Sequence, residues 1–548
     1  MQEVQKKSDE KQKEYKELLK RYHRHSERHV LALEANLSHV DKCKIFHCAD
    51  LERKAGNELI AIMKNNYEQL SRTKKYRKLK KLYGKCVANK NKKEKKKIAL
   101  QLKNLQKQYH LTREDCRVLM IPISKKYRLN SVIGVTKAED IWKAVEKCLY
   151  GDGKKLNFFR RGELPGIRAK QRNKGIVICA QENSLQFKFL GLDFGVKVKD
   201  RFEQEEIRGI LQYLEQPDVI DKQAVEEFQK NNICISTYRP CYATLVCKKI
   251  RGKLRVYVHL TVEGISKPKY DRYGNRKHRL GKGIIGCDIG TQTIAYTSDN
   301  EVGLRNLAER GSSIQVNERR ERLIYRAMDR SKRVSNPQNY NEDGTIRKGP
   351  KRWKYSKRYQ KLKEKHREFS RINAVNRHLS IREDVNYLRS IGDIFVTEPK
   401  NAKRLQKRVK NTTVNSKGKM NCKKRFGKSI QNRCCGYFQS QVERKFKSTE
   451  GTYWEVSNDY RASQYDHTAD EYIKKKLSKR MYSLSDGTIV QRDWYSSYLL
   501  YCISLETKKI DKEKCRNNFE EQYKKEKELI EWIKKNHIKI LNSGIKVA

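Results

Sequence analysis

The chain has 548 residues, with 125 Lys and Arg against 65 Asp and Glu, which gives a formal net charge of +60 at pH 7. This length suggests about two to four domains. The widely spread positive charge calls for a polyanionic partner, and nucleic acid is the default because each phosphate contact releases condensed counterions. A membrane partner is excluded, since no apolar run approaches the roughly 18 residues of a spanning helix and no hydrophobic signal core opens the chain. We therefore expect a soluble intracellular protein.

Cysteine usage indicates a reducing compartment. The 15 cysteines are scattered and no C-x-x-C pair occurs, so a disulfide framework is not expected. The nearest approaches to a metal-ligand cluster are Cys43, His47 and Cys48, and the adjacent Cys434 and Cys435. Because neither group has a second matching half, we expect free thiols there and no zinc.

Residues 1–150 are predicted to be almost wholly helical. Apolar residues recur at helical spacing over 15–22 and 59–63, and an amphipathic helix over 141–146 closes the region. The lysine run over 90–97 has two interpretations. It is either a solvated loop or, in a chain of this charge, a contact for a phosphate backbone.

Residues 151–282 are predicted to form a smaller, β-rich domain. Strand-like runs lie at 175–179, 185–189, 242–247 and 254–260, and the last two have the pattern of a hairpin. The turn of this hairpin is basic. It either contacts phosphates or only keeps the loop solvated.

A second hairpin is predicted from Ile284 to Tyr296. Its first strand carries Asp288, and Gly290 permits a tight turn into the next β-prone run. An isolated D-x-G pattern is often a simple turn cap, so Asp288 needs partners elsewhere. The segment from Ile285 to Thr291 is also close to the first phosphate-binding hairpin of actin-like ATPases and sugar kinases. Those proteins need further Gly-rich turns downstream, and none is found here.

Two more acidic residues follow at comparable places. Basic helices are predicted near 316–332 and 352–390, and the strand after them ends at Glu398. A short strand later ends near Asp493 and continues into a helix. Each of the three acids thus stands in or at the end of a predicted strand.

Carboxylates on neighbouring strands can bind two Mg²⁺ ions about 3.5–4 Å apart, which activate water and stabilise the leaving oxygen during in-line phosphodiester cleavage. Without metal ions, such acids would repel the phosphates that the rest of the chain attracts. We therefore interpret Asp288, Glu398 and Asp493 as the metal-binding catalytic residues of a nuclease.

The sequence resembles the TnpB proteins encoded by insertion sequences, which are regarded as ancestors of the compact type V CRISPR effectors. The resemblance covers about residues 140–515. It is carried by the order of the three acids and by segments that look like those of Clostridia-type TnpB proteins, namely 335–344, 424–430, 462–468 and 491–493.

This resemblance implies a multidomain α+β protein with a split nuclease domain. The implied parts are a helical recognition domain (1–150), a β-rich, barrel-like wedge domain (151–282), the three segments of an RNase H-like RuvC domain (283–315, 391–462, and 489–548 with the C-terminal helix), a helical insertion (316–390) and a degenerate target-loading segment without a zinc ribbon (463–488).

The implied function is that of an RNA-guided DNA endonuclease in a prokaryotic cytoplasm, associated with the nucleoid. In such enzymes base pairing reads the sequence, while the protein reads a short flanking motif and the backbone shape. The implied partners are a guide RNA, either ωRNA or of CRISPR type, and double-stranded target DNA. The implied cofactor is Mg²⁺, held by Asp288, Glu398 and Asp493.

The chain departs from the family pattern at two places. Many relatives place a four-cysteine zinc ribbon between the second and third acids, whereas no Cys lies between Cys435 and Cys502 here. The family also usually opens with a β-strand of the wedge, but this chain begins in a predicted helix. Either the chain lacks that strand, or residues 1–14 form it in place of the predicted helix.

Two other functions stay open on sequence grounds. One is a guide-RNA-dependent repressor that binds DNA without cutting it, because relatives that lose the acids become repressors. The other is a DNA-strand transposase, which can also use three acids. The presence of all three acids favours the nuclease over the repressor.

Overall fold

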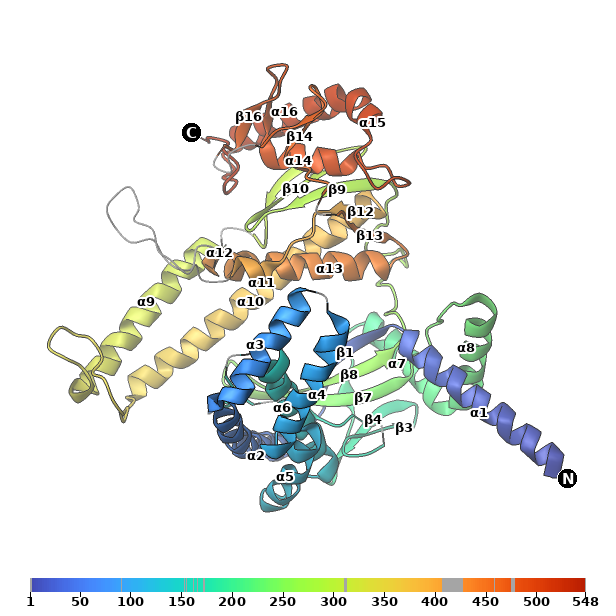
Figure 1. The fold of residues 1–548 in the computed structure, drawn as a ribbon, viewed down its shortest axis with the longest axis vertical. Helices are drawn as coiled ribbons and strands as arrows, with labels where there is room; N and C mark the ends of the chain where they lie inside the picture. The colour runs from blue at the N-terminus through green and yellow to red at the C-terminus, as the bar shows by residue number, and fades with distance from the viewer. Residues whose placement is uncertain are drawn as a thin grey trace. The chain divides into compact units, whose positions relative to one another are not determined.

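The structure is a computed structural model that describes residues 2–547, apart from 90, 152, 154, 161, 165, 171–172, 310–312, 407–426, 458 and 475–478. The chain divides into two compact units, Met1–Lys269 and Tyr270–Ala548. Each unit contains helices and a five-stranded sheet (Figure 1). The expected multidomain architecture of mixed helices and strands is therefore confirmed.

The first unit combines a helical part with an antiparallel sheet. Its helices are α1 (Gln2–His25), α2 (His39–Arg72), α3 (Lys74–Ala88), α4 (Lys92–Gln108), α5 (Arg113–Lys126), α6 (Ser131–Tyr150), α7 (Arg201–Glu215) and α8 (Pro217–Asn231). Its strands are β1 (Arg28–Ala35), β2 (Ile167–Arg168), β3 (Val177–Gln181), β4 (Ser184–Phe189), β5 (Leu192–Phe194), β6 (Val196–Lys197), β7 (Pro240–Ile250) and β8 (Lys253–Glu263). Helices α2 to α6 share one apolar core, which includes Leu59, Met120 and Val145.

Strand β1 corrects the expectation that residues 1–150 are wholly helical. It pairs antiparallel with β8 from Arg28 opposite Glu263 to Glu34 opposite Tyr257. Its inward residues alternate, with Leu31 and Leu33 buried. The Leu, Ala and Glu residues of this segment favour helix, and long-range pairing overrides that preference. Residues 2–14, the other candidate for a strand, belong to helix α1.

The sheet of the first unit is open, so the expected barrel-like shape is wrong. Its strand order is β2-β7-β8-β1-β6, and among the described residues β2 and β6 form its two edges. The predicted hairpin is confirmed as β7 and β8. Helices α7 and α8 lie within the region that was expected to be β-rich, and a small separate sheet has the order β3-β4-β5.

The second unit contains all three predicted catalytic acids. Its strands are β9 (Ile284–Ile289), β10 (Thr293–Thr297), β11 (Val302–Asn306), β12 (Ile394–Thr397), β13 (Thr452–Glu455), β14 (Tyr465–Asp466), β15 (Glu471–Tyr472), β16 (Met481–Ser483) and β17 (Ile489–Gln491). Its helices are α9 (Ser313–Val334), the 3₁₀ turn η1 (Pro337–Asn339), α10 (Lys357–Ile391), α11 (Ala402–Leu405), α12 (Gly427–Arg433), α13 (Cys435–Lys447), α14 (Arg492–Tyr501), α15 (Lys512–Asn517) and α16 (Phe519–Lys535).

The main sheet of the second unit has the order β11-β10-β9-β12-β13. Strand β10 is antiparallel to both β9 and β11, whereas β12 is parallel to both β9 and β13. Only β10 therefore runs against the other four strands. The predicted hairpin from Ile284 to Tyr296 is confirmed as β9 and β10.

Helices cover the two faces of this sheet (Figure 1). On one face, Ile285 and Cys287 of β9 belong to a core that they share with residues of α10 and α13. On the other face α14 lies directly on β9. The two backbones approach so closely that a Cβ atom added to Gly286 would stand only 2.2 Å from the carbonyl oxygen of Ser497. Successive residues of a strand alternate between its faces. The side chain of Asp288 therefore points to the same side as α14.

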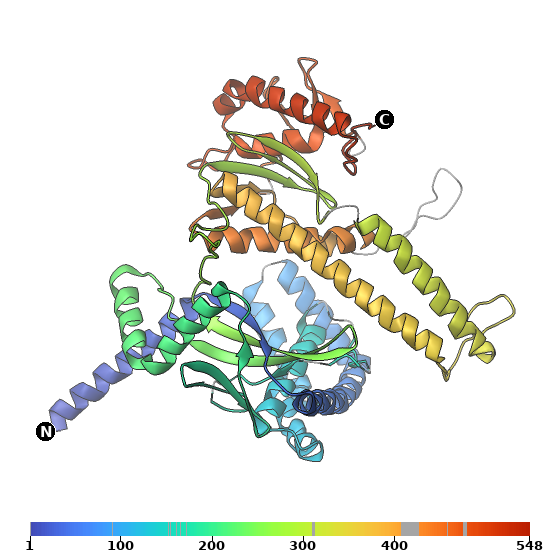
Figure 2. The same ribbon diagram turned by 180° about the vertical axis from the view of Figure 1, so that it is seen from behind.

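The long helices α9 and α10 pack against each other as a hairpin (Figure 2). They correspond to the basic helices predicted near 316–332 and 352–390. Their connection is ordered by Asn336, which donates to the carbonyl oxygen of Lys354 at 2.7 Å and accepts from its amide at 2.6 Å. Within the described part of the chain, no helix has both the length and the apolarity needed to cross a membrane.

The contact of α14 with β9 predicts a large cost for any side chain at position 286. In Gly286→Ala the added methyl group would stand 2.2 Å from both Ser497 O and Tyr501 N. We expect a loss of about 1–3 kcal/mol in the free energy of unfolding, because the helix must move away from the strand. Urea unfolding measures this loss.

The matched control is Gly84→Ala in α3, where an added Cβ atom meets nothing within 4 Å. Gly84 is exposed, and this change should stabilise its helix by about 0.5–1 kcal/mol. Equal effects of the two substitutions would contradict the close packing of α14.

Candidate active site

Asp288 lies inside β9 and is partly buried. It stands opposite Ala295 of β10 in the antiparallel register. The hairpin, whose first strand was predicted to carry Asp288, therefore holds this carboxylate near the centre of the sheet and on the face that α14 covers.

Glu398 immediately follows β12, whose last residue is Thr397. Thr397 pairs with Cys287 in the parallel register, so the next residues along the two strands are Glu398 and Asp288. Neighbouring strands lie about 4.8 Å apart. Residues at the same level of neighbouring strands share a face of the sheet, so Asp288 and Glu398 project to the same side.

Asp493 is the second residue of α14, which begins directly after β17, so it lies where a strand meets a helix, as predicted. Ser497 lies one helical turn further along the same face of the helix, at the point where α14 meets Gly286. The Ser497 hydroxyl is 2.9 Å from the hydroxyl of Thr297 on β10. Both contacts place the N-terminal end of α14, with Asp493, toward Asp288.

The three carboxyl groups interact electrostatically. Burial, followed by the negative charge of Asp288, raises the pKa of Glu398 above its ordinary value, and Lys400 and Arg492 oppose this shift. Burial and the charge of Asp288 likewise raise the pKa of Asp493, against the opposing charges of Arg480 and Arg492. Asp288 is thus the common neighbour of the other two acids.

Arg480 is a functional candidate that the sequence interpretation missed. Its Nη1 lies 3.6 Å from Oδ1 of Asp493, and its carbonyl oxygen accepts a hydrogen bond from the Arg492 amide at 2.9 Å. The only sequence signal was its place at the end of a basic stretch. The pair partly neutralises one acid of the set.

Gln491 fixes the start of α14 through three hydrogen bonds. Its Oε1 accepts from the Trp494 amide at 2.7 Å and caps the helix. Its Nε2 donates to the Ser543 carbonyl at 3.1 Å, and its own amide donates to the Glu526 carboxyl at 3.2 Å. Burial raises the pKa of Glu526 to about 7. The C-terminal segment therefore helps to position Asp493.

The three acids offer a donor set that suits a hard divalent cation, because all their ligand atoms are oxygen. Their mutual repulsion, visible in the raised pKa values of Glu398 and Asp493, is the kind of strain that a bound cation relieves. Among the described residues, however, no three His, Cys, Asp or Glu side chains are gathered closely enough to hold one ion. Metal binding would require these side chains to approach one another.

The segment over 463–488, for which a zinc-free structure was predicted, is organised by a buried acid. Asp466 accepts hydrogen bonds from the amide and hydroxyl of Thr468, at 3.1 and 2.7 Å, and from the amide and hydroxyl of Ser485, both at 3.1 Å. His467 lies 2.8 Å from the hydroxyl of Tyr495. These contacts join the segment to α14. The absence of zinc stays a prediction.

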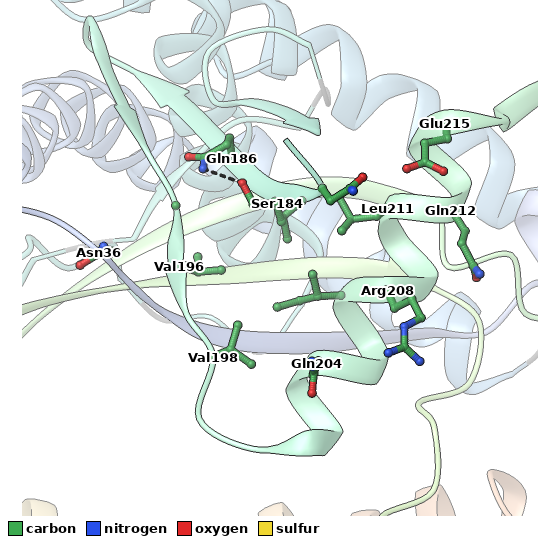
Figure 3. A pocket seen from close by; sticks show the side chains of 14 residues that line it. Asn36, Ser184, Gln186, Val196, Val198, Gln204, Arg208, Leu211, Gln212 and Glu215 are labelled. Carbon is green, nitrogen blue, oxygen red and sulfur yellow. Dashed lines mark hydrogen bonds between the residues drawn. The ribbon is translucent and has the colours of Figure 1, made fainter. Parts of the chain in front are cut away.

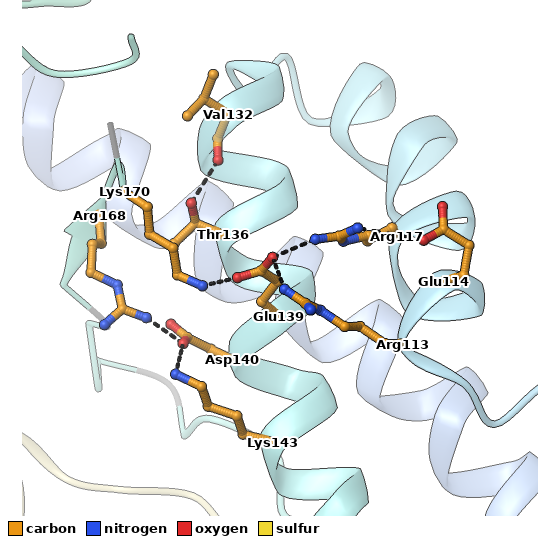
Figure 4. Close-up of polar contacts among 10 residues, drawn as sticks. All are labelled: Arg113, Glu114, Arg117, Val132, Thr136, Glu139, Asp140, Lys143, Arg168 and Lys170. Carbon is orange, nitrogen blue, oxygen red and sulfur yellow. Dashed lines mark hydrogen bonds and ion pairs between the residues drawn. The ribbon is translucent and has the colours of Figure 1, made fainter. Parts of the chain in front are cut away.

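A cluster of cations surrounds one carboxylate in the helical part of the first unit (Figure 4). Glu139 accepts from Arg113 at 2.7 Å and from Arg117 at 2.6 Å, and it also contacts Lys170. Burial and the two neighbouring guanidinium groups lower the pKa of Lys170. Three cations around a single acid leave a local positive excess beside a cavity of about 350 Å³, whose wall includes Arg117 and Lys174.

An amide-rich cavity lies in the same unit, and Arg208 and Glu215 are its charged residues (Figure 3). It has a volume of about 660 Å³, and Asn36, Gln186, Gln204 and Gln212 are among the residues that line it. Amide side chains offer paired donors and acceptors of the kind that read base edges. Nothing in the sequence pointed to this cavity, because its amides are scattered and form no motif.

Comparison with known proteins gives no family and only weak structural similarity. No model of a protein family matches the sequence, and no curated protein matches it. Among solved structures, the Cas12i1 R-loop complex after target DNA cleavage is similar at 10% identity and a TM-score of 0.26, over 88% of this chain and 65% of that one. The selenomethionine-derived Cas12i1 R-loop complex before target DNA cleavage is similar at 10% identity and a TM-score of 0.23, over 78% and 58%. The chain thus spans less than two thirds of these structures, and scores this low establish no common fold.

The raised pKa values predict how Asp288 affects stability. Above the ordinary carboxyl pKa of about 4 the unfolded chain ionises Glu398 and Asp493, whereas the raised pKa values make the folded chain release these protons only at higher pH. The folded state therefore loses stability as pH rises through the raised pKa values. Asp288→Asn removes one source of the shift, so in EDTA at about pH 8 the variant should melt about 1–3 °C higher than the wild type.

This gain should shrink as the pH falls below about 4, because the carboxyl groups then become protonated in both states. Thermal melts at several pH values measure it. The control is Asp459→Asn, because Asp459 is exposed and should give no such gain. If Asp288→Asn melts at or below the wild-type temperature at about pH 8, the charge of Asp288 does not destabilise the folded state.

Proposed function

We propose that the chain is a Mg²⁺-dependent, RNA-guided DNA endonuclease with a RuvC-type nuclease domain. The observation that carries this proposal is the convergence of Asp288 and Glu398 on one face of neighbouring parallel strands, where α14 brings Asp493. The strand order β11-β10-β9-β12-β13, with only β10 reversed, is the arrangement that an RNase H-like domain requires. It supports the nuclease interpretation of the acids.

The protein's own residues prepare the site for phosphodiester cleavage. Asp288, Glu398 and Asp493 would hold Mg²⁺, which when bound supplies an activated water and stabilises the leaving oxygen. Arg492 opposes the rise in the pKa of both Glu398 and Asp493 and so favours their ionised, metal-binding forms. Gln491 fixes the helix that carries Asp493.

The remaining surfaces suit a guide RNA and a target duplex. The cations around Glu139 in the first unit and the Arg- and Lys-rich hairpin of α9 and α10 in the second offer phosphate contacts. Such contacts position nucleic acid without reading its sequence, which base pairing with a guide would supply. A TnpB-like ωRNA and a CRISPR-type RNA are both compatible with this arrangement.

The proposed activity predicts that the protein carries its own RNA and cuts matching double-stranded DNA in Mg²⁺. Asp288→Ala should lower the cleavage rate by at least about 10³-fold, because the shared neighbour of the other acids is removed. Guide-dependent DNA binding should persist. Sequencing of the co-purified RNA, followed by cleavage and filter-binding assays with that RNA, measures both effects.

Asp459→Ala serves as the matched control, since it removes an exposed carboxylate outside the set. The guided mechanism fails if no RNA co-purifies. The catalytic assignment fails if Asp288→Ala cuts at the wild-type rate.

One observation favours a second candidate, a guide-RNA-dependent DNA binder that does not cut. Asp493 is paired with Arg480, and among the described residues the three acids are not gathered at metal-ligand spacing. A wild-type protein that binds guide-matched DNA but never cleaves it in Mg²⁺ would select this candidate.

The cations around Glu139, together with Lys174 in the wall of the adjacent cavity, predict a salt-dependent contribution to RNA binding. Arg117→Ala together with Lys174→Ala should weaken binding of the co-purified RNA at every salt concentration tested. It should also reduce the slope of log K against log salt by about 0.7–0.9 for each phosphate that these side chains neutralise in the wild type. Titrations between low and moderate salt measure the slope.

Lys222→Ala is the control for this measurement, because Lys222 is an exposed lysine of α8 in the same unit. An unchanged slope in the double variant would remove the cluster from the nucleic-acid interface.

A further inference from the structure

Another cavity lies in the second unit, which also holds the three acids. It has a volume of about 1040 Å³ and is formed by β10, β11, α10, Arg433 and the C-terminal segment. Its wall includes residues from both faces of the sheet, because Tyr296 shares the face of Cys287, while Leu304 packs with Ala295, which lies opposite Asp288 in the register. None of Asp288, Glu398 and Asp493 lines the cavity, which is therefore separate from the proposed nuclease site.

The charge of this cavity differs from that of the chain. In a protein of net charge +60, its lining sets the carboxyl groups of Glu301, Glu309 and Asp384 against the cations Arg305, Arg433 and Lys539. Arg433 is engaged, since its Nη1 donates to the Leu307 carbonyl at 3.0 Å and to Glu309 at 3.1 Å. This balanced lining has no excess of cations to hold a phosphate group, and a neutral, polar ligand suits it.

Asp384 offers an unused hydrogen-bonding group in this wall. Its Oδ2 is buried and has no hydrogen-bond partner among the described residues. Burial, assisted by Glu383 and opposed by Arg305, raises the pKa of Asp384 to about 7. A protonated carboxyl group presents one donor and one acceptor side by side. Buried polar groups are normally paired, and this oxygen has almost no accessible surface, so the carboxyl group must rotate to present it to a ligand with a complementary edge in the cavity.

Flat surfaces line the rest of the cavity. The guanidinium of Arg305 stacks 4.2 Å from the ring centroid of Tyr387 and lies 5.7 Å from that of Tyr296. The hydroxyl of Tyr387 donates to both oxygens of Glu301, at 2.6 and 2.7 Å, which fixes its ring. Trp532 also lines the cavity and is 55% exposed. Aromatic and guanidinium planes of this kind stack on flat heterocycles.

We propose that this cavity binds a nucleobase, which stacks on the aromatic and guanidinium planes and pairs its polar edge with the carboxyl group of Asp384. The base has two possible sources, a free nucleoside or nucleotide and an unpaired base turned out of a bound nucleic acid. The ring chemistry is the same for both. The proposal does not depend on nuclease activity, because none of Asp288, Glu398 and Asp493 lines the cavity.

Ligand-observed saturation-transfer NMR on the full-length protein tests the proposal with adenosine, guanosine, cytidine and uridine as probes. At least one nucleoside should bind saturably in the millimolar range or tighter. Asp384→Leu should weaken that binding by about tenfold or more, because the base edge then has no polar partner. Trp532→Ala should also weaken it, and this substitution at a half-exposed position should leave folding intact. Glu383→Leu is the matched control, since Glu383 is the exposed neighbour of Asp384 on the same helix.

A second arm distinguishes the two sources. The probes are an RNA hairpin with one extrahelical adenine and the same hairpin with an abasic residue at that position, compared at high salt. If Asp384→Leu weakens binding of the first hairpin alone, the base comes from nucleic acid, and if it weakens only nucleoside binding, the ligand is a free nucleoside or nucleotide. If no nucleoside or hairpin responds to Asp384→Leu or Trp532→Ala in a protein with a wild-type melting profile, the proposal is wrong.

Discussion

The direct contact between the backbone of α14 and strand β9 is the constraint on which the candidate active site depends. Gly286 leaves no side chain between the two elements, and the hydroxyls of Thr297 and Ser497 join α14 to the next strand. This contact brings Asp493 to the sheet face that carries Asp288, although the long α9 and α10 helices separate them in sequence. Because the site is positioned by packed backbone, its geometry is coupled to the stability of the whole unit.

The fold holds Asp288, Glu398 and Asp493 near one another although their negative charges repel. Burial and the charge of Asp288 both disfavour the ionised forms of Glu398 and Asp493, while Lys400 and Arg492 act in the opposite direction. A group of like charges in a partly buried place stores electrostatic free energy that a cation can release. The nearby cations therefore limit the rise in the pKa values of Glu398 and Asp493 without cancelling it.

Much of the second unit was predictable from local patterns, whereas features that depend on distant partners were not. The hairpin of β9 and β10 and the helices α9 and α10 followed from short-range periodicity and turn residues. Glu398 and Asp493 were correctly placed at the ends of elements, although Asp493 lies in a helix. Strand β1 was missed because its residues favour helix and its partner is remote. Arg480 and the cavity near Asp384 were missed because they depend on residues that are distant in sequence and meet only in the fold.

The pairing of β1 with β8 orders events during synthesis of the chain. Strand β1 leaves the ribosome long before residues 253–263 have been made, so α2 to α6 can assemble their own apolar core before β8 exists. Until then β1 can pair only with β6, at Glu34 and Ala35, and an unpaired strand edge can pair with a strand of another molecule. Any nascent or truncated chain that ends before Lys253 therefore exposes the edge of β1 that β8 covers in the folded chain.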